Sequence, residues 1–85
     1  MAFRGYVLIE AEVGRSKGVG EEMLKLKLPD ARITSVDTLT GPYDVIVQIE
    51  ADDLDKLGQA ITEGIQSIDG VQKTTTCLAV RLGSK

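Results

Sequence analysis

The sequence contains no histidine, no tryptophan and a single cysteine, Cys77. Without imidazole there is no Ser–His or Cys–His nucleophile pair and no histidine ligand for a metal ion. A lone cysteine excludes an internal disulfide, and its place among aliphatic residues predicts an inert thiol packed in the core. No apolar run approaches the roughly 20 residues that span a bilayer. We therefore expect neither an enzyme, nor a bound cofactor or metal, nor a membrane protein.

The residues that are present indicate one small folded domain over residues 1–85. The chain carries 13 acidic and 10 basic side chains and is 42% hydrophobic. The charges are spread out and form no basic stripe, which argues against direct nucleic-acid binding. The N-terminus lacks the basic start and long apolar stretch of a signal peptide, so we expect a cytoplasmic protein. A domain this small gains little from its own core, and self-association is expected.

The clearest strand follows a turn at Gly41-Pro42. Its apolar positions alternate with mostly polar ones, which is the period of a strand. Asp53 then introduces an amphipathic helix that we expect to continue to about Ile68. One predicted face of the strand contains Tyr43, Val45, Val47 and Ile49, and the other contains Asp44, Ile46, Gln48 and Glu50.

The remaining patterns complete the order strand, helix, strand, strand, helix, strand. We expect strands at 3–13, 32–38, 43–50 and 71–82, a short first helix capped by Ser16, and the helix from Asp53. This order predicts a ferredoxin-like α+β fold, a four-stranded antiparallel sheet with two helices on one face. Apolar residues on the uncovered face predict that two sheets pair in a dimer; a few exposed aliphatics are the alternative. The residues that motivate this dimer are Leu8, Ile46, Leu78 and Val80.

Two groups of polar residues suggest a binding site. Tyr43 and Asp44 lie at the entrance to the central strand, and Thr74 and Thr76 lie along the last one. A carboxylate suits an ammonium group, while hydroxyls and free backbone N–H groups suit an acid, so the set fits a small zwitterion. The structural alternatives are that threonine simply favours strands and that Asp44 braces the preceding turn. We interpret the acidic residues near Asp53 as a helix start, because they lack the loop of a calcium hand.

Two motifs are similar to one known family. Gly41-Pro42-Tyr43-Asp44 resembles the Gly-x-Tyr-Asp turn of the effector domain of Lrp/AsnC transcription regulators, and 70–76 resembles its Gly-Val-x-x-Thr-x-Thr segment. The resemblance implies a domain that binds a free amino acid as effector and forms dimers by packing sheets face to face. It also implies that these dimers assemble into rings, with the effector between dimers. The site residues that it implies are Gly41, Tyr43, Asp44, Thr74 and Thr76.

Only two residues precede Phe3 in the sequence, so we expect no helix-turn-helix domain here. We therefore expect a stand-alone, non-enzymatic effector module that joins full-length regulators of the same type. Two other readings share the fold. Cofactor-free dimeric monooxygenases use polar or aromatic residues inside a similar barrel, and the missing histidine and tryptophan count against them. Amino-acid-binding regulatory domains of the ACT type share the strand order but not the Gly-x-Tyr-Asp motif.

Overall fold

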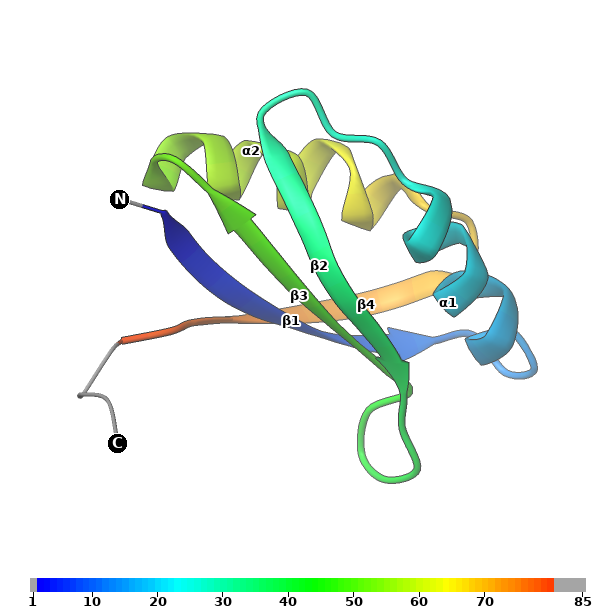
Figure 1. The fold of residues 1–85 in the computed structure, drawn as a ribbon. Helices are drawn as coiled ribbons and strands as arrows, with labels where there is room; N and C mark the ends of the chain where they lie inside the picture. Colours follow the sequence, from blue (N-terminus) through cyan, green and yellow to red (C-terminus); the bar gives the residue numbers. More distant parts are fainter. Residues whose placement is uncertain (1, 81–85) are drawn as a thin grey trace.

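The computed structural model describes residues 2–80 of the chain. Strands and helices follow one another as predicted, with one short 3-10 turn added before the last strand (Figure 1). The predicted strand and helix order is therefore confirmed. The elements are β1 (Phe3–Ala11), α1 (Ser16–Lys25), β2 (Ala31–Thr38), β3 (Val45–Ala51), α2 (Leu54–Glu63), the 3-10 turn η1 (Ile65–Ser67) and β4 (Val71–Leu78).

The strands form one antiparallel sheet in the order β2-β3-β1-β4, so β2 and β4 are its edges. Met23 of α1 and Ile61 of α2 belong to the same buried cluster as Val47 of β3, which places both helices on one face of the sheet. Figure 1 shows this two-layer arrangement, with no helix of the described residues on the other face of the sheet. The ferredoxin-like fold is confirmed. We call the uncovered side of the sheet the open face.

The alternation predicted for the central strand is present in β3. Val45, Val47 and Ile49 face the helices with no exposed surface, whereas Ile46 and Gln48 are half-buried on the open face. Burying one aliphatic side chain contributes about 1.5–3 kcal/mol, so the helix-facing set accounts for much of the core. The strand begins at Val45 rather than at Tyr43, and Tyr43 and Asp44 belong to the preceding loop.

The start of α2 agrees with the sequence, but its end does not. Asp53 caps the helix, since its Oδ1 accepts a hydrogen bond from the N–H of Lys56 at 2.8 Å. The helix ends at Glu63 rather than near Ile68. Ser67 donates its hydroxyl to the carbonyl of Gly64 at 2.7 Å and its N–H to the same oxygen at 3.3 Å, which tightens the chain into η1.

The first helix is short, as predicted, but its cap is different. Arg15 occupies the N-cap position without a side-chain hydrogen bond to the helix, and Ser16 is the first helical residue, so the predicted Ser16 cap is wrong. The first strand also ends earlier than the predicted residue 13. The N–H of Glu12 bonds to the carbonyl of Gly70 at 2.8 Å, and Gly14 turns the chain with a φ of +79°.

A bulge explains why β4 differs from its predicted pattern. Ala11 pairs with Val71 and Glu10 pairs with Lys73, so one extra residue of β4 lies between these pairs. Because side chains alternate between faces, an extra residue reverses the alternation beyond it. The part of β4 after the bulge therefore presents its residues to the faces opposite to those expected.

Several predictions for this strand change as a result. Leu78 pairs with Gly5 and faces the helix side, so its placement on the open face is wrong. Cys77 pairs with Tyr6 on the open face and is exposed, so it is not a core residue. Val80 lies beyond the end of β4 and is 87% exposed, and residues 81 and 82 of the predicted strand lie outside the described residues. The open-face placement of Leu8 and Ile46, which pair directly, is confirmed.

Candidate functional site

The predicted site residues Gly41, Tyr43 and Asp44 lie in the loop between β2 and β3, which projects beyond the sheet in Figure 1. Gly41 has a φ of +152°, which favours glycine, and nothing lies within 4 Å of the position that a Cβ would take. Tyr43 is half-buried at the base of the loop. The carbonyl of Asp44 accepts the N–H of Leu39 at 2.8 Å and thereby closes the loop.

The side chain of Asp44 braces the sheet. Its Oδ2 accepts the backbone N–H of Ala11 at 2.8 Å, and its own N–H donates to the carbonyl of Ile9 at 2.8 Å. Asp44 therefore ties the start of β3 to the end of β1. One alternative from the sequence was that Asp44 braces the Gly41-Pro42 turn. The observed hydrogen bond instead connects Asp44 to the neighbouring strand β1. Among the described residues, Asp44 Oδ1 has no hydrogen-bond partner.

The other predicted residues lie on β4 beside a polar hollow of about 350 Å³. Thr74 is half-buried, and its Oγ1 accepts the side-chain amide of Gln66 at 2.8 Å. Gln72 and Lys73 also line the hollow, whereas Thr76 does not. Gln66 and Lys73 were not among the predicted site residues. Gln66 comes from η1, and no periodic pattern marked that turn.

The two halves of the predicted site lie at the same end of the sheet but do not touch. Val45 and Thr74 both pair with Ile9, from opposite sides of β1. Two strand spacings separate them, which is about 10 Å. Thr76 pairs with Val7 and lies roughly 7 Å further along β4. The strand β1 therefore lies between the Asp44 half and the Thr74 half of the predicted site.

The turn that leads into β4 is held by an ion pair and a required glycine. Arg15 Nη2 lies 2.9 Å from Asp69 Oδ2, and this partner holds the pKa of Asp69 below its ordinary value. Gly70 has a φ of +96°, and a Cβ there would lie 3.0 Å from Cγ2 of Val19. Only glycine fits both the backbone conformation and the close packing. Gly70 in the second motif therefore has a structural role.

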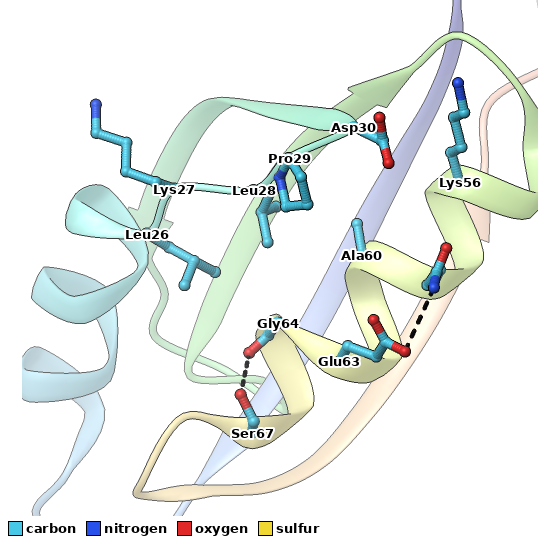
Figure 2. A pocket seen from close by; sticks show the side chains of 11 residues that line it. Leu26, Lys27, Leu28, Pro29, Asp30, Lys56, Ala60, Glu63, Gly64 and Ser67 are labelled. Carbon is cyan, nitrogen blue, oxygen red and sulfur yellow. Dashed lines mark hydrogen bonds between the residues drawn. The ribbon is translucent and has the colours of Figure 1, made fainter.

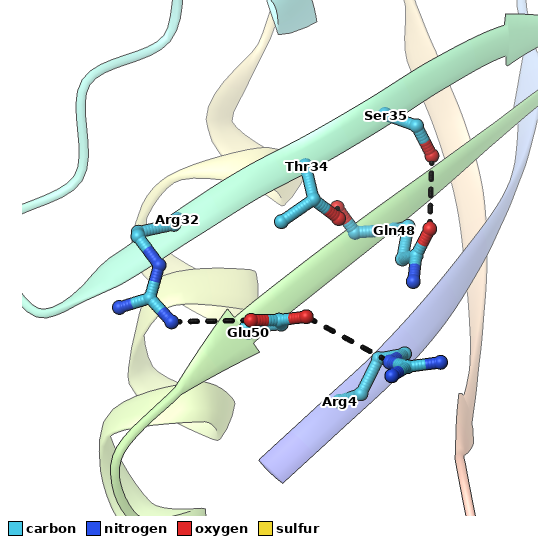
Figure 3. A network of polar contacts seen from close by, with 6 residues as sticks. All are labelled: Arg4, Arg32, Thr34, Ser35, Gln48 and Glu50. Carbon is cyan, nitrogen blue, oxygen red and sulfur yellow. Dashed lines mark hydrogen bonds and ion pairs between the residues drawn. The ribbon is translucent and has the colours of Figure 1, made fainter. Parts of the chain in front are cut away.

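The open face combines an apolar middle with a charged end. Figure 3 shows Glu50 between two arginines, with its Oε1 3.1 Å from Arg32 Nη2 and its Oε2 3.7 Å from Arg4 Nε. The pKa of Arg4 is raised above its ordinary value, first by a hydrogen bond with the Tyr6 side chain and to a smaller extent by Glu50. Next to this end, Ser35 donates its hydroxyl to Oε1 of Gln48 at 3.2 Å. The apolar residues that follow are Tyr6, Leu8, Ile46 and Cys77.

Neither a metal cluster nor a membrane-spanning helix is found in the described part of the chain. Within residues 2–80, no three His, Cys, Asp or Glu side chains gather closely enough to hold a metal ion. The helices of these residues are all too short or too polar to cross a membrane.

The two motifs thus occupy one end of a ferredoxin-like sheet, and this arrangement agrees with the comparison to known proteins. The Lrp/AsnC ligand binding domain, as a family model, matches residues 6–82. The chain belongs to the Lrp/AsnC ligand-binding domain family. The match includes both the Gly41–Asp44 turn and the segment from Gly70 to Thr76.

Relatives of this Lrp/AsnC domain occur at two lengths. An uncharacterized HTH-type transcriptional regulator of Pyrococcus abyssi is 32% identical over 73 residues, which are 86% of this chain and 44% of that protein. A solved structure of a Thermus thermophilus protein is 32% identical, with a TM-score of 0.83 over 98% of this chain and 99% of that chain. The chain therefore spans less than half the length of the curated regulator.

A more distant structure shares the fold. The transcriptional regulator NMB0573 of Neisseria meningitidis, solved as an L-Met complex, is 15% identical, with a TM-score of 0.78 over 98% of this chain and 53% of that chain. At this identity the likeness shows the fold alone.

Proposed function

We propose that this Lrp/AsnC domain binds a free amino acid as an effector, without catalysing a reaction, and that it assembles with itself and with full-length regulators. The observation that carries the proposal is the hollow beside β4. There the Thr74 hydroxyl and the Gln66 amide, which are bonded to each other at 2.8 Å, face an open space together with Lys73 and Gln72. This polar space lies in the second family motif.

The residues at this hollow suit the acid end of an amino acid. A zwitterion gives up strong hydration on entering a pocket, so each charged end needs a fixed partner. The Thr74 hydroxyl and the Gln66 amide both offer donors to a carboxylate, whereas Lys73 pairs with Glu10 and faces the open side. The ammonium end requires an acceptor, and Asp44 Oδ1 is the candidate from the first motif.

Because β1 lies between Asp44 and Thr74 of one protomer, we propose that the two ends of the ligand contact different copies of the chain. The loop of one copy then closes the hollow of another. This arrangement makes binding depend on assembly, so the bound ligand in turn favours the assembled form.

The open face is the surface that we propose for pairing two copies. Tyr6, Leu8 and Ile46 lie next to one another across β1 and β3 and are only half-buried in the protomer. Their remaining apolar surface favours a second sheet as a partner. The dimers formed in this way are the units that we propose assemble into rings.

Calorimetric titration with a panel of free amino acids tests the site. Thr74→Val keeps the shape of the side chain but removes the hydroxyl, and it should weaken binding roughly ten- to a hundredfold. Thr62→Val is the matched control, because Thr62 is exposed on α2 and does not line the hollow. Equal affinities for the wild-type protein and Thr74→Val would place the site elsewhere. If no amino acid in the panel binds saturably, the proposed function is rejected.

A further inference from the structure

The polar hollow beside β4 is formed by two elements that are joined by a short turn. Gln66 belongs to η1 and Thr74 belongs to β4, and their side chains are bonded to each other at 2.8 Å. Residues 68–70 form the turn between these two elements. The position of Gln66 relative to Thr74 therefore depends on how this turn is held.

The start of η1 is held against the helix layer. Figure 2 shows the Ser67 hydroxyl donating to the carbonyl of Gly64, at 2.7 Å, opposite the α1–β2 connection. A Cβ at Gly64 would lie 2.5 Å from Cδ2 of Leu28, so η1 begins in close contact with this connection. This packing fixes one end of the segment that carries Gln66.

The turn that follows has only long hydrogen bonds of its own. The N–H of Ile68 donates to the carbonyl of Ile65 at 3.3 Å, and the N–H of Val71 donates to the carbonyl of Ile68 at 3.2 Å. Backbone hydrogen bonds most often have N···O distances of about 2.9–3.0 Å. Bonds within the turn therefore determine its position only weakly.

The loop between β1 and α1 holds the same turn with shorter contacts. The N–H of Glu12 donates to the carbonyl of Gly70 at 2.8 Å, and Nη2 of Arg15 lies 2.9 Å from Oδ2 of Asp69. Arg15 occupies the N-cap position of α1 but makes no side-chain hydrogen bond to that helix. Its guanidinium group instead binds the turn.

Arg15 also packs along Gly70. A Cβ at Gly70 would lie 3.2 Å from Cβ of Arg15 and 3.5 Å from its Cζ. The Arg15 side chain thus follows the turn from its first carbon to its guanidinium group. The side chain of Asp69 is 90% exposed, and an exposed ion pair contributes little to stability by itself. The contact between Arg15 and the turn is therefore better suited to fixing a position than to stabilising the whole fold.

We propose that Arg15 is a positioning residue for the hollow beside β4: it holds Asp69 and Gly70, and thereby fixes Gln66 relative to Thr74. The inference rests on the proposed binding of an effector in this hollow. Arg15 does not line the hollow itself, so it acts on the ligand only through the turn. The start of α1 then takes part in binding although it does not touch the ligand.

The side-chain amide of Gln66 reports on this role in the absence of any ligand. Its NMR signals depend on the bond to the Thr74 hydroxyl, so Arg15→Ala should move them towards the values of a solvated amide. Lys17→Ala is the matched control and should leave them unchanged, because Lys17 is exposed on α1 and forms no ion pair within residues 2–80. Unchanged Gln66 signals in Arg15→Ala would overturn the proposal.

Affinity is the second measurement, made by calorimetry with the free L-amino acid that binds the wild-type protein most tightly. Arg15→Ala should weaken binding about three- to tenfold while circular dichroism shows a folded protein. Arg15→Lys keeps the charge and most of the carbon chain beside Gly70, so it should recover most of the affinity. Gln66 signals that move while the affinity stays constant would contradict the proposal.

The two measurements also separate this inference from the function on which it rests. If no amino acid binds the wild-type protein, the proposed effector function is rejected. The Gln66 signals still decide whether Arg15 positions the hollow, because they require no ligand.

Discussion

The helix-covered face and the open face of the sheet use alternate residues of the same strands for different purposes. On the covered side of β3, Val47 and Ile49 have no exposed surface. On the open side of the same strand, Ile46 is half-buried and Glu50 forms ion pairs with arginines of both neighbouring strands. The first set stabilises one protomer, and the second remains available for a partner. Stability and assembly should therefore respond to different substitutions in the same strand.

The largest expected effect is a loss of stability when the same substitution, isoleucine to alanine, is made on the covered face rather than on the open face. Ile49→Ala should lower the free energy of unfolding by about 2–5 kcal/mol, because it leaves a cavity in a closely packed core. Ile46→Ala removes the same atoms from the open face and should cost less than half as much in the dilute protein. Urea denaturation at low protein concentration measures both. Equal losses for the two variants would contradict the distinction between the faces.

The next effect concerns assembly. Leu8→Asp should weaken the dimer at least about a hundredfold, because a symmetric interface loses two buried aliphatic side chains, each worth about 1.5–3 kcal/mol. Sedimentation velocity gives the dissociation constant, and circular dichroism shows whether the protomer remains folded.

Leu78→Asp is the control for this experiment. Leu78 faces the helix side and is 43% exposed, so its replacement should change the dissociation constant by less than about threefold. Dissociation by Leu78→Asp but not by Leu8→Asp would show that the register of β4 differs from the one described.

A smaller loss of stability is expected from removing the Asp44 carboxylate, which lies just before β3. Asp44→Ala removes the carboxylate that accepts the N–H of Ala11 and should lower the free energy of unfolding by about 1.5–3 kcal/mol. Asp37→Ala is the control, since Asp37 is exposed on β2. Thermal unfolding of both variants measures the difference. If the two variants unfold at the same temperature, Asp44 does not brace the sheet.

The smallest effect is a pH dependence on the covered side. Arg15 holds the pKa of Asp69 below its ordinary value of 3.8, so the pair stabilises the fold above that pH and ceases to do so as the pH falls through the lowered pKa. The melting temperature of Asp69→Asn should therefore lie below that of the wild type at neutral pH and converge with it in acid. A difference that stays constant down to about pH 2 would exclude this contribution.

Much of the covered face could be predicted from the sequence because it depends on local patterns. The alternation in β3 and the Asp53 cap are each determined by a few neighbouring residues. The faces of β4 could not be predicted in this way. They depend on the extra residue opposite Glu10 and Ala11, which is a property of two paired strands. The predicted burial of Cys77 and the predicted orientation of Leu78 were wrong for this reason.

The sequence named candidate residues for the site, but it did not predict how they are arranged in space. Tyr43, Asp44 and Thr74 lie at the same end of the sheet. The bond from Asp44 to Ala11 depends on where β1 ends, and the contribution of Gln66 depends on η1. Both follow from tertiary contacts that no single stretch of sequence contains. The role of all these residues in binding a ligand stays a prediction.

Native mass spectrometry of the wild-type protein, with and without free amino acids, tests the central claim most directly. We expect an oligomer with an even number of subunits that retains amino acid when a member of the panel is present, because the ligand contacts two copies of the chain. Loss of the bound amino acid should accompany dissociation in Leu8→Asp. A folded monomer at micromolar concentration that retains no amino acid from the panel would contradict the account.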